Sequence, residues 1–325
     1  MLSKRAFMFS ASAALTVPHV AHAQSINFDD VFARFPQMRT LHIQRQDALI
    51  FEGAAKGIGL DSFANIKSVS KTIVALLLGS AIDRGEIASV DATIGEITPQ
   101  LLPANATPGA ADITVQDLVT LRAGLERTSG ANYGGWVNSS NWVADALSRP
   151  FVGAPGGPML YSSGSTHVLG AILSEVSGKS LLELARERLG QPLGIEIPPW
   201  TRDPQGYYMG GNQMALRPEA MLKVARLIRD IGRFGDQQVI SGDWMIASTQ
   251  RYTASNWSGL AYGYGLFLSP SGFAIARGYG GQIVAAHRER RLAIAISSDP
   301  NLPARSDGYF GELMALLDGP ILAVS

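Results

Sequence analysis

The chain has 325 residues, which is enough for one large domain or two closely packed lobes. Lys plus Arg and Asp plus Glu both number 27, so the formal net charge is zero. This balance argues against a nucleic-acid or anionic-membrane partner, for which clustered basic residues are typical. The sequence contains no cysteine, which excludes a disulfide framework and a thiol nucleophile.

The first residues have the three parts of a secretory signal peptide. Lys4 and Arg5 precede an apolar stretch over residues 6–17, and residues 21–23, Ala-His-Ala, form a small-x-small exit. The stretch is too short and too interrupted for a membrane anchor, and no later segment reaches membrane-spanning length. We expect cleavage after Ala23 and export to the periplasm or the medium.

The first elements of the mature chain are expected to be a helix and two strands. An amphipathic helix is predicted over 28–35, and strands over 41–43 and 48–53, joined by a turn at 46–47. A buried helix over 68–84 follows. It contains the apolar run 73–78, and Gly85 is suited to close it in the left-handed conformation.

Ser68 and Lys71 form the first candidate catalytic pair. Positions i and i+3 lie on one face of a helix, so both side chains should point the same way. A lysine driven towards its neutral form by burial can take the proton of a serine and make it a nucleophile. Chance alone produces Ser-x-x-Lys about once in 300 residues. A lysine on the solvated flank of the helix is the alternative.

The middle of the chain is predicted to be mostly helical and the end mostly strand. We expect an irregular segment over 91–108, a helix over 113–119 with a Thr114 cap, loops over 130–141 and 150–158, and helices over 167–176, 181–189 and 218–231. Alternating runs over 262–268, 273–276, 283–286 and 292–297 indicate antiparallel strands, and a last helix spans about 309–317. One sheet can therefore recruit both ends of the chain, with a cleft between it and a helical lobe.

The second candidate motif is Tyr161-Ser162-Ser163. A phenol beside an ammonium is held closer to its ionised form, so Tyr161 is suited to pass protons between nucleophile and leaving group. Ser163 is suited to hold the lysine or the tyrosine by a hydrogen bond. The alternative is an ordinary tyrosine before a helix that Ser163 or Ser165 caps.

A glycine-rich turn over 278–282, between two expected strands, is the third candidate. Gly278 and Gly280 let the backbone approach a substrate closely and direct N–H groups at it, as an oxyanion hole requires. A plain hairpin turn is the alternative. Tyr133 and Trp136, in the loop 129–136, are candidate substrate-binding residues that offer a rigid apolar surface. The alternative is that Trp136 fills the core of the helical lobe.

Other chemistries lack their motifs in this sequence. No Gly-x-Ser-x-Gly elbow is present, and no phosphate-binding loop or dinucleotide fingerprint. The histidines do not cluster with carboxylates at zinc-ligand spacing, and we expect His42 and His167 to be structural. No metal and no cofactor is therefore expected.

Three motifs of this sequence, in their order along the chain, resemble those of penicillin-recognising serine enzymes. They are Ser68-x-Ser70-Lys71, Tyr161-x-Ser163 and the glycine-rich turn over 278–282. These enzymes are the serine β-lactamases, the D-alanyl-D-alanine carboxypeptidases and their esterase and amide-hydrolase relatives, and the class C branch is the most similar. The resemblance covers most of the chain after about residue 40. It implies a two-lobed α/β (α+β) fold: an α/β lobe over about 24–90 and 200–325, and a helical lobe over about 91–199, in a single catalytic domain over 24–325.

The resemblance also implies a serine hydrolase that works through a covalent acyl-enzyme. Ser68 would attack, Lys71 and Tyr161 would move protons, and the N–H groups of Ser68 and Tyr279 would hold the oxyanion. Ser163 would support the lysine or the tyrosine. The expected partner is a small-molecule ester or amide, and the sequence does not indicate an oligomeric state.

Two departures from the family pattern bear on the substrate. The β-lactamases carry Lys or His at the start of the third motif, where it receives the substrate carboxylate. Here this position falls at Ala276 or Arg277, which makes Arg277 a candidate substrate-binding residue, and Ser163 replaces the usual asparagine. Both changes are similar to those in carboxylesterases of this fold and in hydrolases of 6-aminohexanoate oligomers. The alternatives are a class C-like β-lactamase or D-alanyl-D-alanine carboxypeptidase, in which Arg277 replaces the lysine, and an inert binding protein on the same fold.

Overall fold

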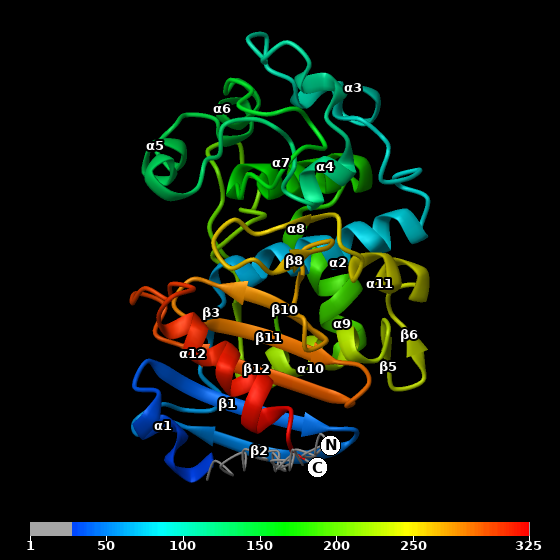
Figure 1. The fold of residues 1–325 in the computed structure, drawn as a ribbon. Coiled ribbons are helices and arrows are strands. Elements are labelled where there is room, and N and C mark those ends of the chain that lie inside the picture. Colours follow the sequence, from blue (N-terminus) through cyan, green and yellow to red (C-terminus); the bar gives the residue numbers. More distant parts are fainter. Residues whose placement is uncertain (1–27, 325) are drawn as a thin grey trace, which may run out of the picture.

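The computed structural model describes residues 28–324, so the predicted signal peptide lies outside the described residues. An eight-stranded sheet of order β2-β1-β12-β11-β10-β9-β8-β7 organises the chain, and every neighbouring pair in it is antiparallel. Strands β1 (Met38–Arg45) and β2 (Ala48–Ala54) come from the beginning of the chain, and β7 (Thr253–Ala254) to β12 (Leu292–Ser298) from its end. The prediction that one sheet recruits both ends is confirmed (Figure 1).

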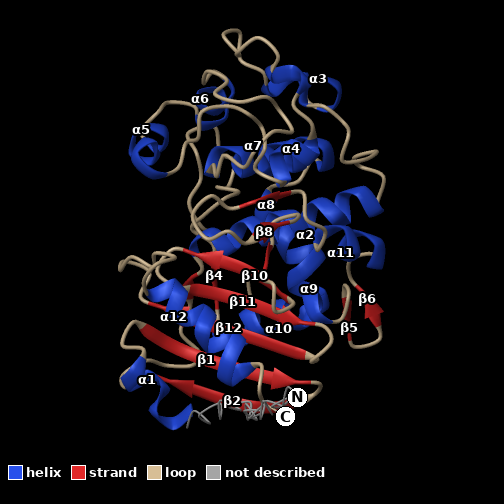
Figure 2. Ribbon diagram, viewed as in Figure 1, coloured by secondary structure: helices blue, strands red, loops and turns tan. Residues whose placement is uncertain are grey.

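Most of the predicted helices agree with the structure to within a few residues, and five of the helices named below were not predicted. The helices are α1 (Val31–Arg34), α2 (Ser70–Asp83), α3 (Ile94–Ile97), α4 (Val115–Val119), α5 (Tyr133–Val137), α6 (Trp142–Leu147), α7 (Ser163–Ser177), α8 (Leu181–Ala185), α9 (Gln191–Leu193), α10 (Pro218–Arg229), α11 (Gly242–Ser248) and α12 (Tyr309–Leu316). The remaining strands are β3 (Ala64–Asn65), β4 (Ala215–Leu216), β5 (Arg233–Phe234), β6 (Gln237–Gln238), β8 (Ala261–Tyr262), β9 (Phe267–Leu268), β10 (Phe273–Gly278) and β11 (Gln282–His287). Figure 2 shows how helices and strands are distributed.

Three predicted segments differ from the structure. The run 262–268 is two short strands, because Gly263 and Leu266 close a turn by a backbone hydrogen bond of 2.8 Å. The predicted loop 130–141 contains α5, and the segment 91–108 contains α3. A capping box between Thr93 and Glu96 starts α3, since each residue's side chain accepts the other's backbone N–H.

The central strands are buried on both faces, and the two faces differ in side-chain size. In β12, Ala293 and Ala295 belong to the core that includes α2 and α10, whereas Ile294 and Ile296 belong to the core beneath α12. Successive side chains of a strand point to opposite faces, so this alternation assigns each residue to one layer. The small residues let α10 pack closely on the sheet.

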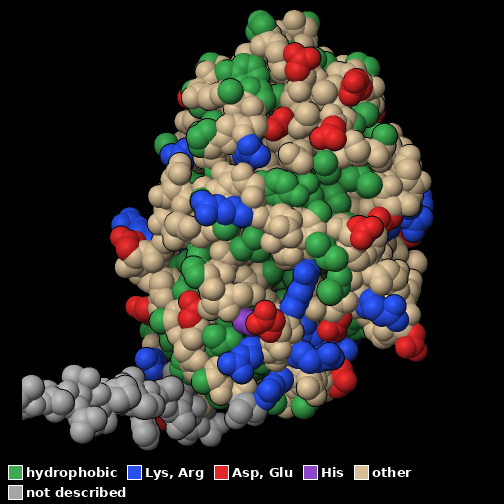
Figure 3. All heavy atoms as spheres, turned by 45° about the vertical axis from the view of Figure 1, so that its right-hand side comes forward, with side chains coloured by type: hydrophobic (Ala, Val, Ile, Leu, Met, Phe, Trp, Pro, Cys, Tyr) green, Lys and Arg blue, Asp and Glu red, His purple; other side chains and the backbone are tan. Residues whose placement is uncertain are grey.

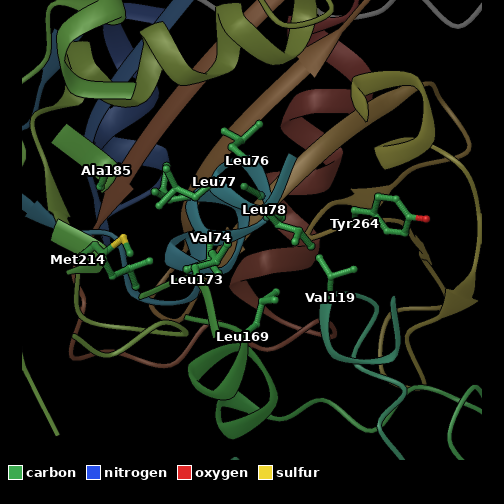
Figure 4. Packing of buried hydrophobic residues seen from close by; sticks show 14 of the residues in the cluster. Val74, Leu76, Leu77, Leu78, Val119, Leu169, Leu173, Ala185, Met214 and Tyr264 are labelled. Carbon is green, nitrogen blue, oxygen red and sulfur yellow. The ribbon is translucent and has the colours of Figure 1, made fainter. Parts of the chain in front are cut away.

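Helix α2 lies between the sheet and the helices that gather above it in Figure 1. Residues 70–81 are all buried, as expected for a helix that is apolar on every side. Figure 4 shows Val74, Leu77 and Leu78 surrounded by side chains from several other elements. This burial places the first turn of α2, with Lys71, in the interior of the protein. The lobe boundaries near residues 90 and 200 stay a prediction.

Two further features of the structure concern membrane-spanning helices and surface charge. Within residues 28–324, no helix combines the length and the apolar character needed to cross a membrane. On the face in Figure 3, basic and acidic side chains both occur and are interspersed with polar and apolar ones.

Candidate active site

The Ser68 backbone is held in a tight turn just before α2. Residues 67–69 form a 3₁₀ turn, and Lys67 adopts a φ of 50°, which is unfavourable for a residue with a side chain. The side chain of Asn65 accepts the Lys67 N–H at 3.0 Å, and the Ser70 hydroxyl donates to the Lys67 carbonyl at 2.6 Å. These two contacts fix the conformation from which Ser68 projects.

Lys71 is buried and lies against Ser68. Its side chain is 3% exposed, so the alternative of a lysine on a solvated flank is wrong. The Lys71 Nζ atom is 3.2 Å from the Ser68 Oγ atom, as the i, i+3 spacing predicts. Ser68 itself is half-buried. The pair therefore joins a hydroxyl that solvent can reach to an amine in the interior.

Two further groups hold the lysine amine. Nζ donates to the Ser163 Oγ atom at 3.1 Å and to the Gly211 carbonyl at 2.6 Å. Burial lowers the Lys71 pKa from its usual value to about 7. A neutral amine has two N–H donors and one lone pair. When the donors face Ser163 and Gly211, the lone pair is left for the Ser68 hydroxyl, which is the arrangement a general base needs.

Ser163 is the first residue of α7 and is itself anchored. Its N–H donates to the Ser129 hydroxyl at 2.9 Å, and the two hydroxyls are 3.2 Å apart. The sequence suggested that Ser163 holds either Lys71 or Tyr161 by a hydrogen bond, and in the structure it is Lys71 that bonds to the Ser163 hydroxyl. The alternative of a Ser163 or Ser165 cap does not hold, because the N-cap position of α7 is Ser162.

Tyr161 lies over the lysine, and its electrostatics differ from the prediction. The Lys71 Nζ atom is 4.9 Å from the centre of the Tyr161 ring. Burial raises the pKa of Tyr161, and a hydrogen bond with Ser68 and the charge of Arg277 offset this only in part. The prediction that this phenol is held near its ionised form is therefore wrong. Tyr161 is a neutral phenol beside a lysine with a lowered pKa.

The glycine-rich turn is a hairpin that packs beside the Ser68 segment. Gly278 pairs with Gln282 across β10 and β11, and the Gly281 N–H donates to the Gly278 carbonyl at 3.2 Å. A Cβ atom at Gly278 would lie 2.3 Å from the Ile66 carbonyl oxygen, so the residue must be glycine. Gly280 has a φ of 82°. The turn is thus both a hairpin and a neighbour of the Ser68 segment, and the oxyanion role of the Ser68 and Tyr279 N–H groups stays a prediction.

The guanidinium of Arg277 is engaged within the protein. It donates to the Ser306 hydroxyl at 3.1 Å and to the Ala304 carbonyl at 3.2 Å. It also lies 3.4 Å from the centre of the Phe310 ring. This side chain is therefore committed to the 304–310 segment, and the prediction that it contacts substrate gains no support.

Trp136 belongs to the core and not to a pocket wall. Its side chain is fully buried and packs with Trp142 and Met209, so its prediction as a substrate-binding residue is wrong. Its indole N–H donates to the Trp142 carbonyl at 2.9 Å. Tyr133 is only partly buried, and its hydroxyl accepts a hydrogen bond from the Asn212 side chain at 3.1 Å.

These positions predict different effects for two truncations. Trp136→Ala should lower the free energy of unfolding by about 3–5 kcal/mol, because it empties a large buried volume. Tyr133→Ala should leave the melting temperature within a few degrees and lower kcat/KM. Thermal unfolding and kinetics per folded molecule measure both. A large fall in melting temperature for Tyr133→Ala, with kcat/KM unchanged, would show that Tyr133 is also a core residue.

Sequence reasoning missed three groups at this site: the Gly211 carbonyl, the Ser129 hydroxyl and Trp257. The Gly210-Gly211 doublet was the available signal for the first. Trp257 is 51% exposed and packs edge-on against Tyr161 with ring centres 5.4 Å apart. A cavity of about 500 Å³ beside residues 268–274 and 286–289 contains none of the candidate residues.

The two histidines expected to be structural are paired with carboxylates. The His42 Nε2 atom lies 3.2 Å from the Glu52 carboxylate, on the adjacent strands β1 and β2. Burial lowers the pKa of His42. The His167 Nε2 atom lies 3.0 Å from the Asp203 carboxylate, and both side chains are fully buried.

An antiparallel sheet beside a set of helices, with a Ser-x-x-Lys pair whose lysine is buried, is the arrangement of a β-lactamase-like protein. Residues 41–317 match the beta-lactamase family, and the chain belongs to that family. The predicted fold is thereby confirmed.

Individual relatives include ester and amide hydrolases. Esterase EstB of Burkholderia gladioli is 27% identical over 172 residues, which cover 47% of this chain and 42% of EstB, less than half the length of that relative. A Bacillus anthracis protein provisionally assigned as a 6-aminohexanoate-dimer hydrolase superposes with a TM-score of 0.75 at 16% identity, covering 89% of this chain and 80% of the other. EstCE1, a hydrolase with promiscuous acyltransferase activity, gives a TM-score of 0.73 at 17% identity, covering 90% of this chain and 96% of its own. At such identities the structural likeness shows the fold alone.

Proposed function

We propose that the protein is a serine hydrolase that cleaves an uncharged ester or small amide through a covalent acyl-enzyme. The observation that carries this proposal is the contact of 3.2 Å between the Lys71 amine and the Ser68 hydroxyl. A buried lysine with a pKa of about 7 is partly neutral at neutral pH, so it can act as a base.

In the proposed acylation, the Ser68 oxygen attacks the substrate carbonyl carbon and its proton passes to Lys71. The carbonyl oxygen becomes an oxyanion, which the N–H groups of Ser68 and Tyr279 are proposed to hold. The bond to the leaving group then breaks and leaves the acyl group on Ser68. Water attacks this ester in the second half of the reaction and gives one proton to Lys71. The bond to the Ser68 oxygen then breaks as Lys71 returns that proton to it, which releases the acid and restores the serine.

Tyr161 is proposed to deliver the proton to the leaving group. Its raised pKa keeps the phenol protonated, so it is suited to donate and not to begin the reaction as a phenolate. Lys71, which has gained the serine proton, lies 4.9 Å from the centre of the tyrosine ring and can restore the phenol's proton through a water molecule, because the acylated Ser68 oxygen has no proton to pass on. The base and the acid are therefore different residues.

The substrate class follows from the groups around the pair. The cation that could receive a carboxylate in the third motif is Arg277, which is already bound to Ser306 and Ala304. The exposed side chain against Tyr161 is the indole of Trp257. These features favour an uncharged, partly apolar substrate over a carboxylate-bearing β-lactam. An inert binding protein on this fold is disfavoured, because Ser68, Lys71 and Tyr161 are all present and lie next to one another.

The rate should depend on pH through Lys71. Below about pH 7 the amine is protonated and has no lone pair, so kcat/KM for an uncharged ester should rise with pH through that range. Kinetics across the neutral range with an uncharged ester test this, since the substrate then contributes no titration. A profile that stays flat, or that falls as pH rises through neutrality, would rule out Lys71 as the base.

A substrate panel tests the proposed function itself. The purified protein is assayed with p-nitrophenyl butyrate, a chromogenic cephalosporin and a linear ω-amino-acid amide, with the Ser68→Ala variant as the blank. A fixed cation against a carboxylate contributes about 1.5–3 kcal/mol, so its absence should favour the uncharged ester by one to two decades in kcat/KM. Preferred hydrolysis of the cephalosporin would reverse the proposed substrate class.

A further inference from the structure

The His167–Asp203 pair is a buried titratable pair that the proposed reaction does not use. His167 lies on α7 one turn after Ser163. The second carboxylate oxygen of Asp203 accepts the N–H groups of Gln205 and Tyr207 at 2.9 and 2.8 Å. Asp203 is thus fixed by the backbone, and it fixes the imidazole in turn.

The hydrogen bonds of His167 define its tautomer. The Gly210 N–H donates to the Nδ1 atom of His167 at 3.4 Å, so Nδ1 carries no proton in this arrangement. The proton is then on Nε2, which donates to Asp203 at 3.0 Å. One imidazole ring therefore connects the carboxylate to the backbone of residue 210.

Residues 210 and 211 lie directly on α7, beside the lysine. A Cβ atom at Gly210 would be 2.3 Å from the Thr166 carbonyl, and one at Gly211 would be 3.2 Å from the Lys71 Nζ atom. The Gly211 carbonyl accepts from Nζ at 2.6 Å. A shift of this backbone would therefore move one of the acceptors that orient the lysine.

We propose that His167, held by Asp203, is a positioning residue that fixes the Gly210–Gly211 backbone so that the Gly211 carbonyl orients the Lys71 amine towards Ser68. Helix α7 then acts on the lysine twice, directly through Ser163 and one turn later through His167 and the glycines. This inference rests on the proposed function, because it assigns the support of the proposed base.

Two substitutions of His167 separate its two contacts. In His167→Gln the terminal amide reaches the Nε2 position, so it can still donate to Asp203 but offers Gly210 no acceptor. In His167→Asn the side-chain oxygen lies near the Nδ1 position, so it can accept from Gly210 but loses Asp203. We expect kcat of His167→Gln to fall by up to about 10²-fold relative to wild type. The fall in kcat of His167→Asn should be smaller, because the Gly210 N–H keeps its acceptor.

The pH profile gives a readout that a purely structural role would not move. A carbonyl acceptor stabilises the ammonium form, so its loss should shift the acid limb of kcat/KM to lower pH. Among the described residues, the titratable side chain against Lys71 is Tyr161, on which the charge of Arg277 acts, and no variant changes either. Glu86→Gln, which alters the remote pair of Glu86 with Arg188, is the matched control and should leave kcat and the profile unchanged.

Asp203→Asn is a second variant for the case that the His167 variants do not fold. Because one oxygen must still accept from Gln205 and Tyr207, the new NH₂ group faces Nε2. The amide NH₂ group donates to Nε2, so the ring proton must move to Nδ1, where it opposes the Gly210 N–H. Asp203→Asn should therefore show the same fall in kcat and the same shift in pH profile as His167→Gln. Unchanged kcat and pH profile per folded molecule in these variants, or equal losses in the glutamine and asparagine variants, would overturn the inference. Hydrolysis that survives Ser68→Ala would instead contradict the proposed function.

Discussion

Ser68→Ala should lower kcat/KM by roughly 10³-fold or more, because the acyl-enzyme cannot form without the nucleophilic oxygen. Ser68 is half-buried at the start of the helical segment, and the neighbouring lysine leaves it a path for its proton. The fold should survive the change, since the substitution removes one oxygen from a position that solvent reaches.

The measurement is steady-state hydrolysis of p-nitrophenyl butyrate, together with intact mass spectrometry after a phosphonate probe. The probe should add one adduct to the wild-type protein and none to the variant. Ser80→Ala, near the other end of α2, is the matched control and should keep both activity and labelling. Near-native activity of Ser68→Ala, or an adduct on another residue, would show that Ser68 is not the nucleophile.

Lys71→Ala and Tyr161→Phe should each remove most of the activity, and the double variant should be little worse than either. Both residues serve the transfer of one proton from Ser68 to the leaving group. Once one substitution has disabled this transfer, the other can lower kcat little further, so the two effects should not add. Each single change should cost about 10²- to 10⁴-fold in kcat, the range of general acid–base catalysis.

A double-mutant cycle in kcat measures this coupling. The control cycle combines Lys71→Ala with Tyr207→Phe, whose phenol is hydrogen-bonded to Glu175 instead of facing the lysine. The control losses should add, and Tyr207→Phe alone should change kcat little. Additive losses for Lys71 and Tyr161 would mean that the two residues act in separate steps.

Many of the helices and strands, and the contact between Ser68 and Lys71, could be predicted because they depend on local spacing. Ser68 and Lys71 are three residues apart in a helical segment, which fixes their relative position whatever surrounds them. The predicted Thr114 cap of α4 is confirmed for the same reason, and in the structure Thr114 and Asp117 form a reciprocal capping box. The antiparallel strands at the end of the chain follow from alternation with a period of two residues.

The tertiary structure alone decided the environment of these residues. Lys71 finds the Gly211 carbonyl 140 positions further along the chain, and no local pattern relates the two. The engagement of Arg277 by the 304–310 segment and the burial of Trp136 likewise depend on contacts between distant elements. Tyr161 shows the consequence most directly. Its sequence neighbourhood suggested a lowered pKa, but burial, which removes stabilising water from a charged phenolate, raises it. Spacing along the chain determined that Ser68 and Lys71 meet, and tertiary packing determined their other partners and the direction in which the pKa values of Lys71 and Tyr161 shift.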